Sequence, residues 1–175
     1  MDAFAQLISS ADPAMVIVTA ALGDERAGCL IGFHAQSSIE PERYAVWLSK
    51  ANHTFRVAQH ATHLGVHFLA ADQHDLAEHF GTRTGDEVDK FADVEHEDGV
   101  EGVPLLVACT NRFVARRTAM LDEGGDHVCV VCEPLVVEAD GAFVPLRLGD
   151  VKDLQAGHRA EERHRPPTER SADRA

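Results

Sequence analysis

"EHEDGVEGVPLLVACTNRFVARRTAMLDEGGDHVCVVCEPLVVEADGAFVPLRL", residues 95–148, is the stretch that decides the fold class. Apolar runs alternate in it with turns that contain glycine, such as the Gly124–Gly125 pair. Apolar, β-branched runs of this length are typical of strands, and short glycine turns between them join neighbouring strands in opposite directions. The stretch therefore predicts an antiparallel meander.

Three more strands are predicted on the N-terminal side of this meander. Residues 14–22, "AMVIVTAAL", have the composition of a buried strand, and the polar turn 23–28 leads into a return strand over residues 29–39. Within the return strand, Gly32 predicts either a β-bulge or a point where another group approaches the backbone closely. Residues Tyr44–Leu48 are predicted to form the third strand.

The middle of the chain predicts two short helices with a strand between them. The first covers residues 53–64, with Asn52 or Thr54 as its N-cap. A strand over residues 65–71 leads into the second helix, within residues 72–86. The expected features of the second helix are Asp72 as N-cap, an apolar face of Leu76, Ala77 and Phe80, and Gly81 as its stop.

Strands, then small helices, then strands again are typical of an α+β, mainly β domain whose antiparallel sheet closes into a barrel. The length of 175 residues allows one core without disulfide bonds. We expect one domain over residues 1–155 and a disordered tail over residues 156–175, because residues 158–175 contain no aliphatic side chain larger than alanine.

Charge and hydropathy exclude several classes of protein. The net charge is -13, and the five arginines and four acids of residues 158–175 give that segment +1, which leaves -14 on the rest. A surface this acidic repels phosphate backbones, so a nucleic-acid partner is not expected. No apolar run has the length of a membrane helix and the first residues lack the pattern of a signal peptide, so we predict a cytoplasmic protein without membrane association.

A metal site is not predicted. Cys129 and Cys132 have C-x-x-C spacing, but they fall in an apolar, β-branched run that predicts a strand, where residues three apart point to opposite faces. Cys29 and Cys109 stand alone, so we interpret all four cysteines as reduced thiols in the interior. The eleven histidines have spacings that do not converge on one ion, and most of them are expected on the surface.

The turn "SKANHT", residues 49–54, is a candidate phosphate-binding element. It offers hydroxyl groups, one ammonium group and the free amides of a helix start. The alternative is that Asn52 or Thr54 simply caps the helix that follows. The fingerprints of the usual nucleotide-binding loops and of the serine hydrolases are missing from the chain.

Five segments carry a resemblance to a known family: "GCLIGFHAQSSIEPERYAVWLSKANHTFRVAQ" (28–59), "GVHFLAADQHDLAEHFG" (65–81), "DKF" (89–91), "GVPLL" (102–106) and "EGGDHVCVVCEPLVV" (123–137). In this order they resemble the flavin reductase family of FMN-binding split barrels. The resemblance covers about residues 10–155, and its most specific part is the triplet Gly125-Asp126-His127 before a strand. It implies an antiparallel split β-barrel with a few short helices.

The family resemblance also implies a set of site residues. The flavin would be FMN, with FAD as a second option, and NADH or NADPH would be the co-substrate. His127 would lie near the nicotinamide, with Asp126 holding its ring. The implied cofactor-binding residues are Ile31, Gly32, Phe33, His34 and Ala35 along the isoalloxazine edge, and Ser38, Ser49, Lys50, Asn52, His53 and Thr54 around the phosphate and ribityl groups.

Two departures from the family pattern affect the expected flavin contacts. Where the family often has T-x-S-S-F, this chain has Leu30-Ile31-Gly32-Phe33-His34, so two hydroxyl donors are lost and a histidine is gained. Glu42 replaces the second proline of the usual pair. Backbone contacts from this segment to the flavin remain expected.

The function that the resemblance implies is NAD(P)H-dependent flavin reduction, in which hydride passes from the nicotinamide to flavin N5 and the reduced flavin can serve a monooxygenase. Three charge-assisted hydrogen bonds to a phosphate contribute about 5 to 9 kcal/mol in total, which an association cost of about 4 to 15 kcal/mol can cancel. Burial of the ring must supply the rest, and we expect a homodimer with the flavin at its interface.

Two other functions stay open from the sequence. One is a split barrel that binds flavin, or haem through a histidine such as His34, without turning over NAD(P)H. The other is a flavin-dependent oxidoreductase that acts on a small organic substrate. Neither the choice between NADH and NADPH nor an oxygenase partner can be predicted from these residues, because the chain carries no ribose-binding fingerprint.

Overall fold

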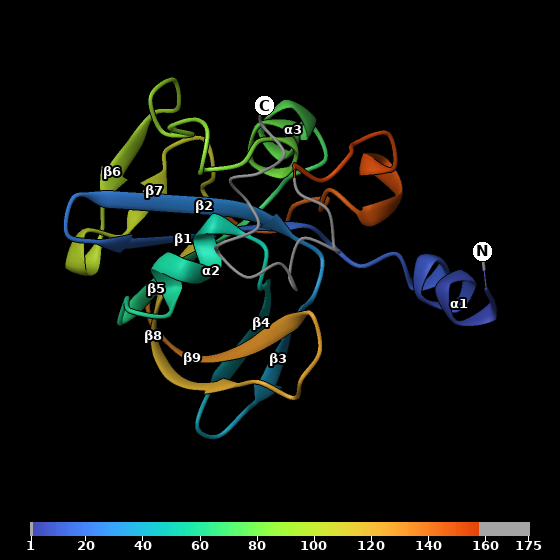
Figure 1. Cartoon of the computed structure of the whole chain (residues 1–175), viewed down its shortest axis with the longest axis horizontal. Helices are drawn as coiled ribbons and strands as arrows, with labels where there is room; N and C mark the ends of the chain where they lie inside the picture. The colour runs from blue at the N-terminus through green and yellow to red at the C-terminus, as the bar shows by residue number, and fades with distance from the viewer. Residues whose placement is uncertain (1, 158–175) are drawn as a thin grey trace, which may run out of the picture.

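In the computed structural model, which describes residues 2–157, a curled antiparallel sheet is surrounded by short helices (Figure 1). Residues 158–175, most of the predicted tail, lie outside the described residues. In chain order the elements are α1 (Ala3–Ala11), β1 (Val16–Leu22), β2 (Glu25–Ile31), β3 (His34–Ser38), β4 (Arg43–Ser49), α2 (His53–Ala58), β5 (His63–Phe68), α3 (His74–Thr82), β6 (His96–Asp98), η1 (Val100–Gly102), β7 (Pro104–Leu106), β8 (Arg112–Leu121), β9 (His127–Glu138) and η2 (Leu148–Val151).

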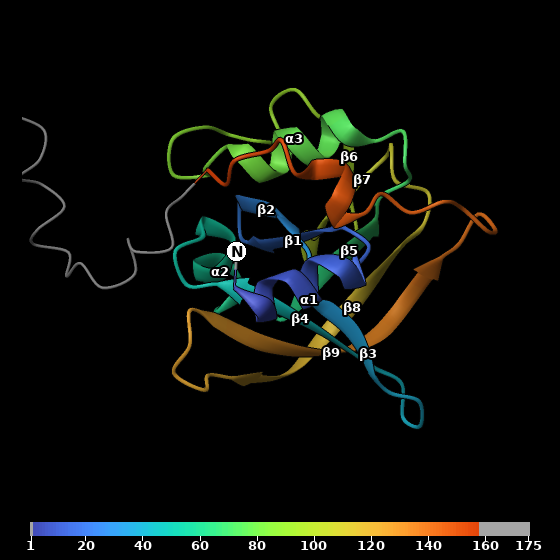
Figure 2. The same cartoon turned by 90° about the vertical axis from the view of Figure 1, so that its right-hand side faces the viewer.

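The main sheet has the strand order β2-β1-β5-β8-β9-β4-β3, and each neighbouring pair is antiparallel. The sheet curls, so that β9, β4 and β3 lie below β1 and β2 in Figures 1 and 2, while α3 lies above them. The predicted fold class is therefore confirmed: the chain is a mainly β, antiparallel split barrel with a few short helices.

The burial of β1 on both faces explains why its sequence is apolar except for Thr19, whose hydroxyl donates to the Pro104 carbonyl oxygen. Val16, Val18 and Ala20 face the interior of the barrel, where they pack with residues of β4, β5, β8 and β9. Met15 and Ile17 belong to a second cluster, which α3 and η2 build on the other side of the strand. Because both faces of β1 are buried, it shows no alternation of polar and apolar residues.

The helix α2 fills the open side of the barrel. Phe55, Val57 and Ala58 join the interior cluster, and Asn52 is the N-cap, since its side-chain Oδ1 accepts a hydrogen bond from the Thr54 amide at 3.1 Å. Of the two caps that the sequence left open, Asn52 is the one used. The predicted helix over residues 53–64 is too long, because the chain turns after Ala58 and β5 begins at His63.

The predicted single strand over residues 29–39 is wrong. β2 ends at Ile31 and pairs with β1, whereas β3 begins at His34 and pairs with β4 on the opposite wall. The chain crosses from one wall to the other at Gly32 and Phe33, which lie between the two hydrogen-bonded ladders. The sequence shows continuous strand propensity here, and only the curvature of the sheet requires the break.

The second helix is also displaced from its predicted bounds. α3 covers His74–Thr82 with Gln73 at the N-cap position, and no side chain caps it. Gly81 therefore lies inside the helix instead of stopping it. A Cβ at this position would stand 3.0 Å from Leu30 Cδ2, so the glycine allows α3 to approach β2 closely.

The predicted meander is confirmed for its long hairpin and needs two corrections. β8 and β9 pair over most of their length, joined by a turn with Gly124 at φ +85°. β6 and β7 form a separate two-stranded sheet, and residues after β9 contribute only isolated bridges from Pro145 and Arg147. The bounds of β6 and β7 could not be predicted, because strands this short depend on turns and tertiary contacts that the sequence does not show.

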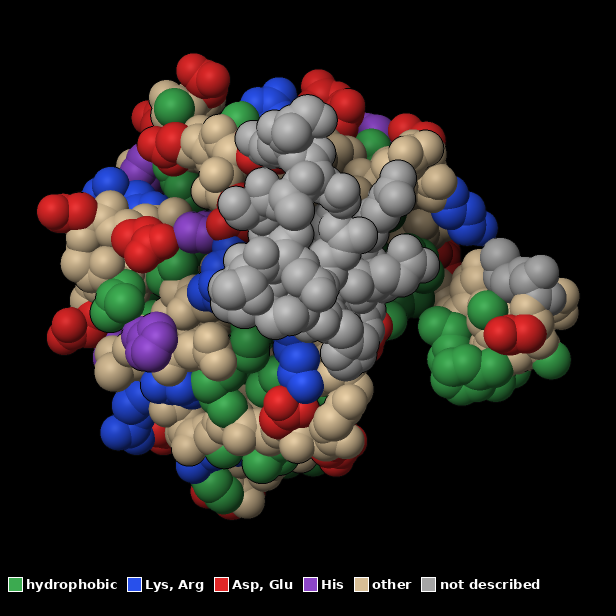
Figure 3. Space-filling view, viewed as in Figure 1, with side chains coloured by type: hydrophobic (Ala, Val, Ile, Leu, Met, Phe, Trp, Pro, Cys, Tyr) green, Lys and Arg blue, Asp and Glu red, His purple; other side chains and the backbone are tan. Residues whose placement is uncertain are grey.

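The N-terminal helix α1 was not predicted. Asp2 caps it by accepting a hydrogen bond from the Ala5 amide at 2.8 Å, and Phe4, Leu7 and Ile8 have helical spacing. The helix projects from the body (Figure 1), and its apolar side chains form a patch at the right-hand edge of Figure 3. Among the described residues, no helix is long and apolar enough to span a membrane.

Candidate functional site

A cleft of about 420 Å³ opens where β2 ends and the chain crosses to β3. Its floor and walls come from segments far apart in the sequence: the end of β2, the end of β4, the end of α3 and the start of β9. The apolar lining residues are Met15, Cys29, Leu30, Ile31, Phe33, Trp47, Phe80, Leu148 and Ala156, and the polar ones are Ser49, Asn52, Arg83, Thr84, Asp126 and His127; Gly32, Gly81 and Gly157 complete the lining.

Asp126 and His127 form the pair that the sequence singled out at the mouth of β9. The His127 ring Nδ1 lies 2.8 Å from Asp126 Oδ1, which orients the imidazole and leaves Nε2 free of this contact. The ring is 5.2 Å from the Phe33 ring, edge to face. Burial lowers the pKa of His127 in spite of the adjacent carboxylate, so the ring is a neutral imidazole at pH 7.

The end of β4 and the cap of α2 contribute Ser49 and Asn52 to the cleft. Asn52 accepts from the Thr54 amide through Oδ1, which leaves the NH₂ group of its side chain as a donor for a ligand. Ser49 is 8% exposed, and its Oγ accepts a long hydrogen bond of 3.4 Å from the Ala51 amide. Asn52 can therefore take both roles that the sequence left open: it caps α2 through Oδ1, and its NH₂ group can donate to a phosphate.

The other three predicted site residues of this turn, Lys50, His53 and Thr54, do not line the cleft themselves and contact other side chains. Lys50 Nζ donates to Asp122 Oδ1 at 2.8 Å, and that contact lowers the pKa of Asp122. Thr54 is buried, and its side chain partly offsets the rise that burial causes in the pKa of the Cys29 thiol, which lines the cleft. His53 lies between two carboxylates, Glu25 and Asp86.

The predicted flavin-binding residues between positions 31 and 38 also fall into two groups, one inside the cleft lining and one outside it. Ile31, Gly32 and Phe33 line the cleft, whereas His34, Ala35 and Ser38 lie along the edge strand β3, outside the lining. His34 Nδ1 is 2.6 Å from the Tyr44 hydroxyl and Nε2 is 2.8 Å from the Ala14 carbonyl oxygen. Since Tyr44, whose pKa burial raises to about 12, is a neutral donor, Nδ1 accepts and Nε2 donates.

Arg83 and Thr84 are lining residues that the sequence analysis did not identify as site residues. They follow the end of α3, and their only local signal is the polar, glycine-flanked run "GTRTGD" at 81–86. That run resembles an ordinary helix terminus. Its place beside Ser49 and Asn52 depends on the packing of α3 against β2.

A second cavity of about 450 Å³ adjoins the first. Phe33, Trp47, Asp126 and His127 line both cavities, so these four side chains form the boundary between them. The second cavity is completed by Leu121, Glu123, Gly125 and Cys129. Two adjoining spaces that share one histidine can hold two ligands in contact with each other.

The thiols do not form a cysteine pair. All four cysteines are free, and burial alternates along β9 so that Cys132 faces the barrel interior while Cys129 faces the second cavity. This is the geometry expected for residues three apart on a strand. Burial raises the pKa of Cys132 to about 12 and that of Cys109 to about 11, so both are neutral thiols at pH 7.

A family model described as "Flavin reductase like domain" matches residues 9–147. Among curated proteins, the FMN reductase (NADH) SmoA of Agrobacterium fabrum is 33% identical over 121 residues, which cover 69% of this chain and 67% of SmoA. The ferric-chelate reductase (NAD(P)H) of Archaeoglobus fulgidus is 26% identical over 125 residues, which cover 71% of this chain and 74% of the relative.

A similar fold is found among solved structures. The flavin reductase domain protein from Arthrobacter sp. FB24 superimposes with a TM-score of 0.72, at 22% sequence identity, over 81% of this chain and 86% of that protein. At this identity the likeness concerns the fold.

Proposed function

Because the chain belongs to the flavin reductase like domain family, we propose that it is an NAD(P)H-dependent flavin reductase that binds FMN in the 420 Å³ cleft. The observation that carries this assignment is the mixed lining of the cleft, which offers both apolar and polar groups. Apolar side chains such as Ile31, Phe33 and Trp47 suit a tricyclic ring, and the polar group of Ser49, Asn52, Arg83 and Thr84 suits a phosphorylated ribityl chain.

The backbone of the crossover also suits a bound flavin. Gly32 and Phe33 lie between the two ladders and line the cleft, and the Phe33 carbonyl oxygen is held by a hydrogen bond from the Trp47 amide at 2.9 Å. Fixed peptide dipoles stabilise charge that develops on a bound ring without reorganisation. A bound flavin supplies the redox chemistry, accepting a hydride from the nicotinamide at N5 together with a proton.

We assign His127 to the nicotinamide nucleotide. It lines both cavities, its Nδ1 is held by Asp126, and its neutral ring presents Nε2 as an acceptor. An oriented neutral acceptor can hold the nicotinamide amide group without attracting or repelling its phosphates. Asp126 acts through His127 as a positioning residue.

A homodimer belongs to the same proposal. The cleft is open on one side, and the Phe33 ring beside it is 53% exposed. No residue of α1 is buried, and its apolar side chains include Phe4 at 73% and Leu7 at 68% exposure. A second copy would cover both surfaces and supply the ring burial that FMN binding requires.

The rival haem function is disfavoured by the surroundings of His34. Both nitrogens of its ring are engaged, with Tyr44 and with the Ala14 carbonyl oxygen, and its pKa is lowered by burial. An axial ligand needs a free ring nitrogen, so haem binding here would break a buried hydrogen bond.

The reductase function is tested by anaerobic titration of the FMN-loaded protein with NADH and with NADPH. We expect one or both nucleotides to bleach the visible flavin absorption band with one equivalent per flavin. FMN binding without bleaching by either nucleotide would identify a non-catalytic flavin binder. Product formed from a small organic compound in a flavin-saturated assay would favour the third function.

The proposed function also includes an acceptor for the reduced flavin and a cellular compartment for the protein. We propose that the flavin serves a monooxygenase in the cytoplasm, where the four free thiols stay reduced. A coupled assay in which a flavin-dependent monooxygenase depends on this protein for turnover tests the transfer.

A further inference from the structure

Arg83 differs from the other arginines of the described chain in having no side-chain partner there. Seven arginines bind a carboxylate or a carbonyl oxygen, namely Arg26, Arg43, Arg56, Arg112, Arg116, Arg117 and Arg147. Arg83 is exposed and lines the cleft. In a chain with a net charge of -13, a cation without a carboxylate partner at a ligand cleft indicates an anionic ligand.

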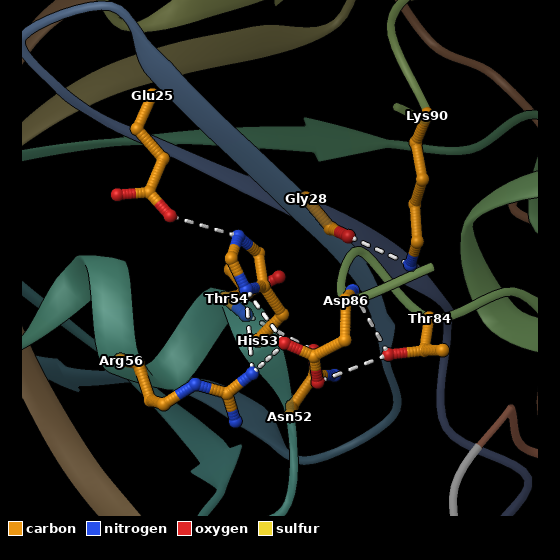
Figure 4. A network of polar contacts seen from close by, with 9 residues as sticks. All are labelled: Glu25, Gly28, Asn52, His53, Thr54, Arg56, Thr84, Asp86 and Lys90. Atoms are coloured by element: carbon orange, nitrogen blue, oxygen red, sulfur yellow. Dashed lines mark hydrogen bonds and ion pairs between the residues drawn. The ribbon is translucent and has the colours of Figure 1, made fainter. Parts of the chain in front are cut away.

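The loop that carries Arg83 is anchored against α2. Asp86 Oδ1 accepts hydrogen bonds from His53 Nδ1 at 3.2 Å and from the Arg56 guanidinium, and its backbone amide donates to Thr84 Oγ1 at 3.3 Å. These contacts with α2 lower the pKa of Asp86. Figure 4 shows His53 and Arg56 pointing from α2 toward the Asp86 carboxylate.

Close packing adds to these polar contacts. A Cβ on Gly85 would stand 2.7 Å from His53 Cδ2, so only glycine lets the loop approach the ring this closely. His53 also contacts Glu25 on the β1–β2 hairpin at 3.2 Å. Because His53 directly follows Asn52, this cluster places Arg83 and Thr84 on the same side of the cleft as the cap of α2.

We propose that Arg83 binds the terminal phosphate of the flavin mononucleotide, and that the contacts of Asp86 with His53 and Arg56 position Arg83 for this contact. The proposal rests on the proposed function and extends it to a residue that the sequence pattern did not indicate. The planar guanidinium offers paired donors that match a phosphate monoester, and the side-chain NH₂ group of Asn52 is a neutral donor in the same cleft lining. Lys50, engaged by Asp122, is not needed for this contact.

The test compares FMN with riboflavin, which has the same ring but no phosphate. Binding of each is followed by flavin fluorescence quenching on the full-length protein, the variant Arg83→Gln and the control Arg116→Gln. The control removes the same charge at an exposed site on β8. We expect Arg83→Gln to weaken FMN binding about tenfold and riboflavin binding less than twofold, and Arg116→Gln to change neither.

Several outcomes would overturn the assignment while leaving the reductase function intact. One is an unchanged ratio of FMN to riboflavin affinity in Arg83→Gln. Another is a selective increase of KM for NADPH over NADH, which would place the 2′-phosphate of the nucleotide at Arg83. A lower melting temperature with unchanged FMN binding would show that Arg83 only complements the carboxyl end of α3. Loss of NAD(P)H turnover in the wild type would instead contradict the proposed function.

The positioning role of Asp86 has its own readout. Asp86→Asn should weaken FMN binding about threefold without affecting riboflavin, since the loop loses its charged contacts to α2. In the double variant with Arg83→Gln, Asp86→Asn should cost nothing further, because its effect acts through Arg83. Additive losses in the double variant would contradict the positioning role.

Discussion

His127 and His67 show how burial sets the protonation of single residues in this fold. His127 keeps one side toward the two cavities, and burial lowers its pKa. His67 is fully buried, and burial lowers its pKa to about 4. Both rings are neutral at pH 7, but the first faces the cavities that we propose bind ligands, and the second is enclosed in the interior.

The variant His127→Asn should raise KM for NADH about tenfold while FMN affinity stays within twofold, since one oriented hydrogen bond to the nicotinamide is lost. In the wild type, KM should be constant above pH 6.5 and change only at lower pH, where the ring gains a proton. Steady-state kinetics at several pH values check this, with His60→Gln, an exposed histidine, as the matched control. Equal KM values in His127→Asn and the wild type would remove His127 from the nicotinamide site.

His67 connects three elements through its two ring nitrogens. Nδ1 lies 3.1 Å from the Ile17 carbonyl oxygen on β1, and Nε2 accepts from the Leu106 amide on β7 at 3.1 Å. Nδ1 therefore carries the hydrogen, and a second proton on the ring would break the bond to Leu106. Arg112, which also lies near the ring, disfavours that proton further.

The free energy of unfolding should fall between pH 6.5 and pH 4 because the unfolded chain then binds a proton that folded His67 does not. The contribution is fully present above pH 6.5 and can reach about 3 kcal/mol. Urea unfolding at a series of pH values measures it, and His67→Gln should flatten the dependence in this window. His60→Gln should retain the wild-type slope, and equal slopes in all three proteins would contradict the assignment to His67.

Among elements, the contact between α3 and β2 determines where the loop after α3 lies. Lys90 is 4% exposed, and its Nζ donates to the Gly28 carbonyl oxygen at 3.0 Å and to the Phe80 carbonyl oxygen at 2.9 Å. It therefore connects the middle of β2 to the end of α3. Arg83 comes three residues after Phe80, so the contacts of Lys90 with Gly28 and Phe80 also determine where Arg83 lies at the cleft.

Gly28→Ala should destabilise the protein by about 1 to 3 kcal/mol, as overpacking of a dense core does. The new Cβ would stand 2.8 Å from Phe80 Cε1 and 3.2 Å from Phe91 Cζ, so α3 must move away from β2. Chemical denaturation measures the loss. Gly125→Ala is the control, because its Cβ meets no atom within 4 Å, and equal losses in both variants would show that the effect is not contact with α3.

For the whole molecule, the distribution of exposed apolar side chains predicts association. Replacing Phe4 and Leu7 of α1 with aspartate should convert a dimer into a monomer and weaken FMN binding, because the second copy no longer covers the cleft. Light scattering coupled to gel filtration measures the mass. Ser10→Glu, on the same helix, should leave the mass unchanged, and a wild-type protein that runs as a monomer would refute the dimer.

Much of this fold could be predicted from local sequence. The strand character of residues 14–22 and 44–48, the β8–β9 hairpin and a helix cap at either Asn52 or Thr54 all depend on neighbouring residues, which the sequence shows directly. The family resemblance is also a property of the sequence, and the match over residues 9–147 confirms it.

The three-dimensional arrangement of the site was decided by the tertiary structure. The segment 29–39 had to break at Gly32 because the sheet curls between two walls, and Arg83 lies in the same cleft as Asn52 only because α3 packs on β2. Likewise, Lys50 and His53 have carboxylate partners from distant segments, Asp122 and Asp86. Local propensity reports how one residue follows the next, whereas these contacts join residues more than thirty positions apart, whose meeting depends on the curvature and packing of the whole sheet.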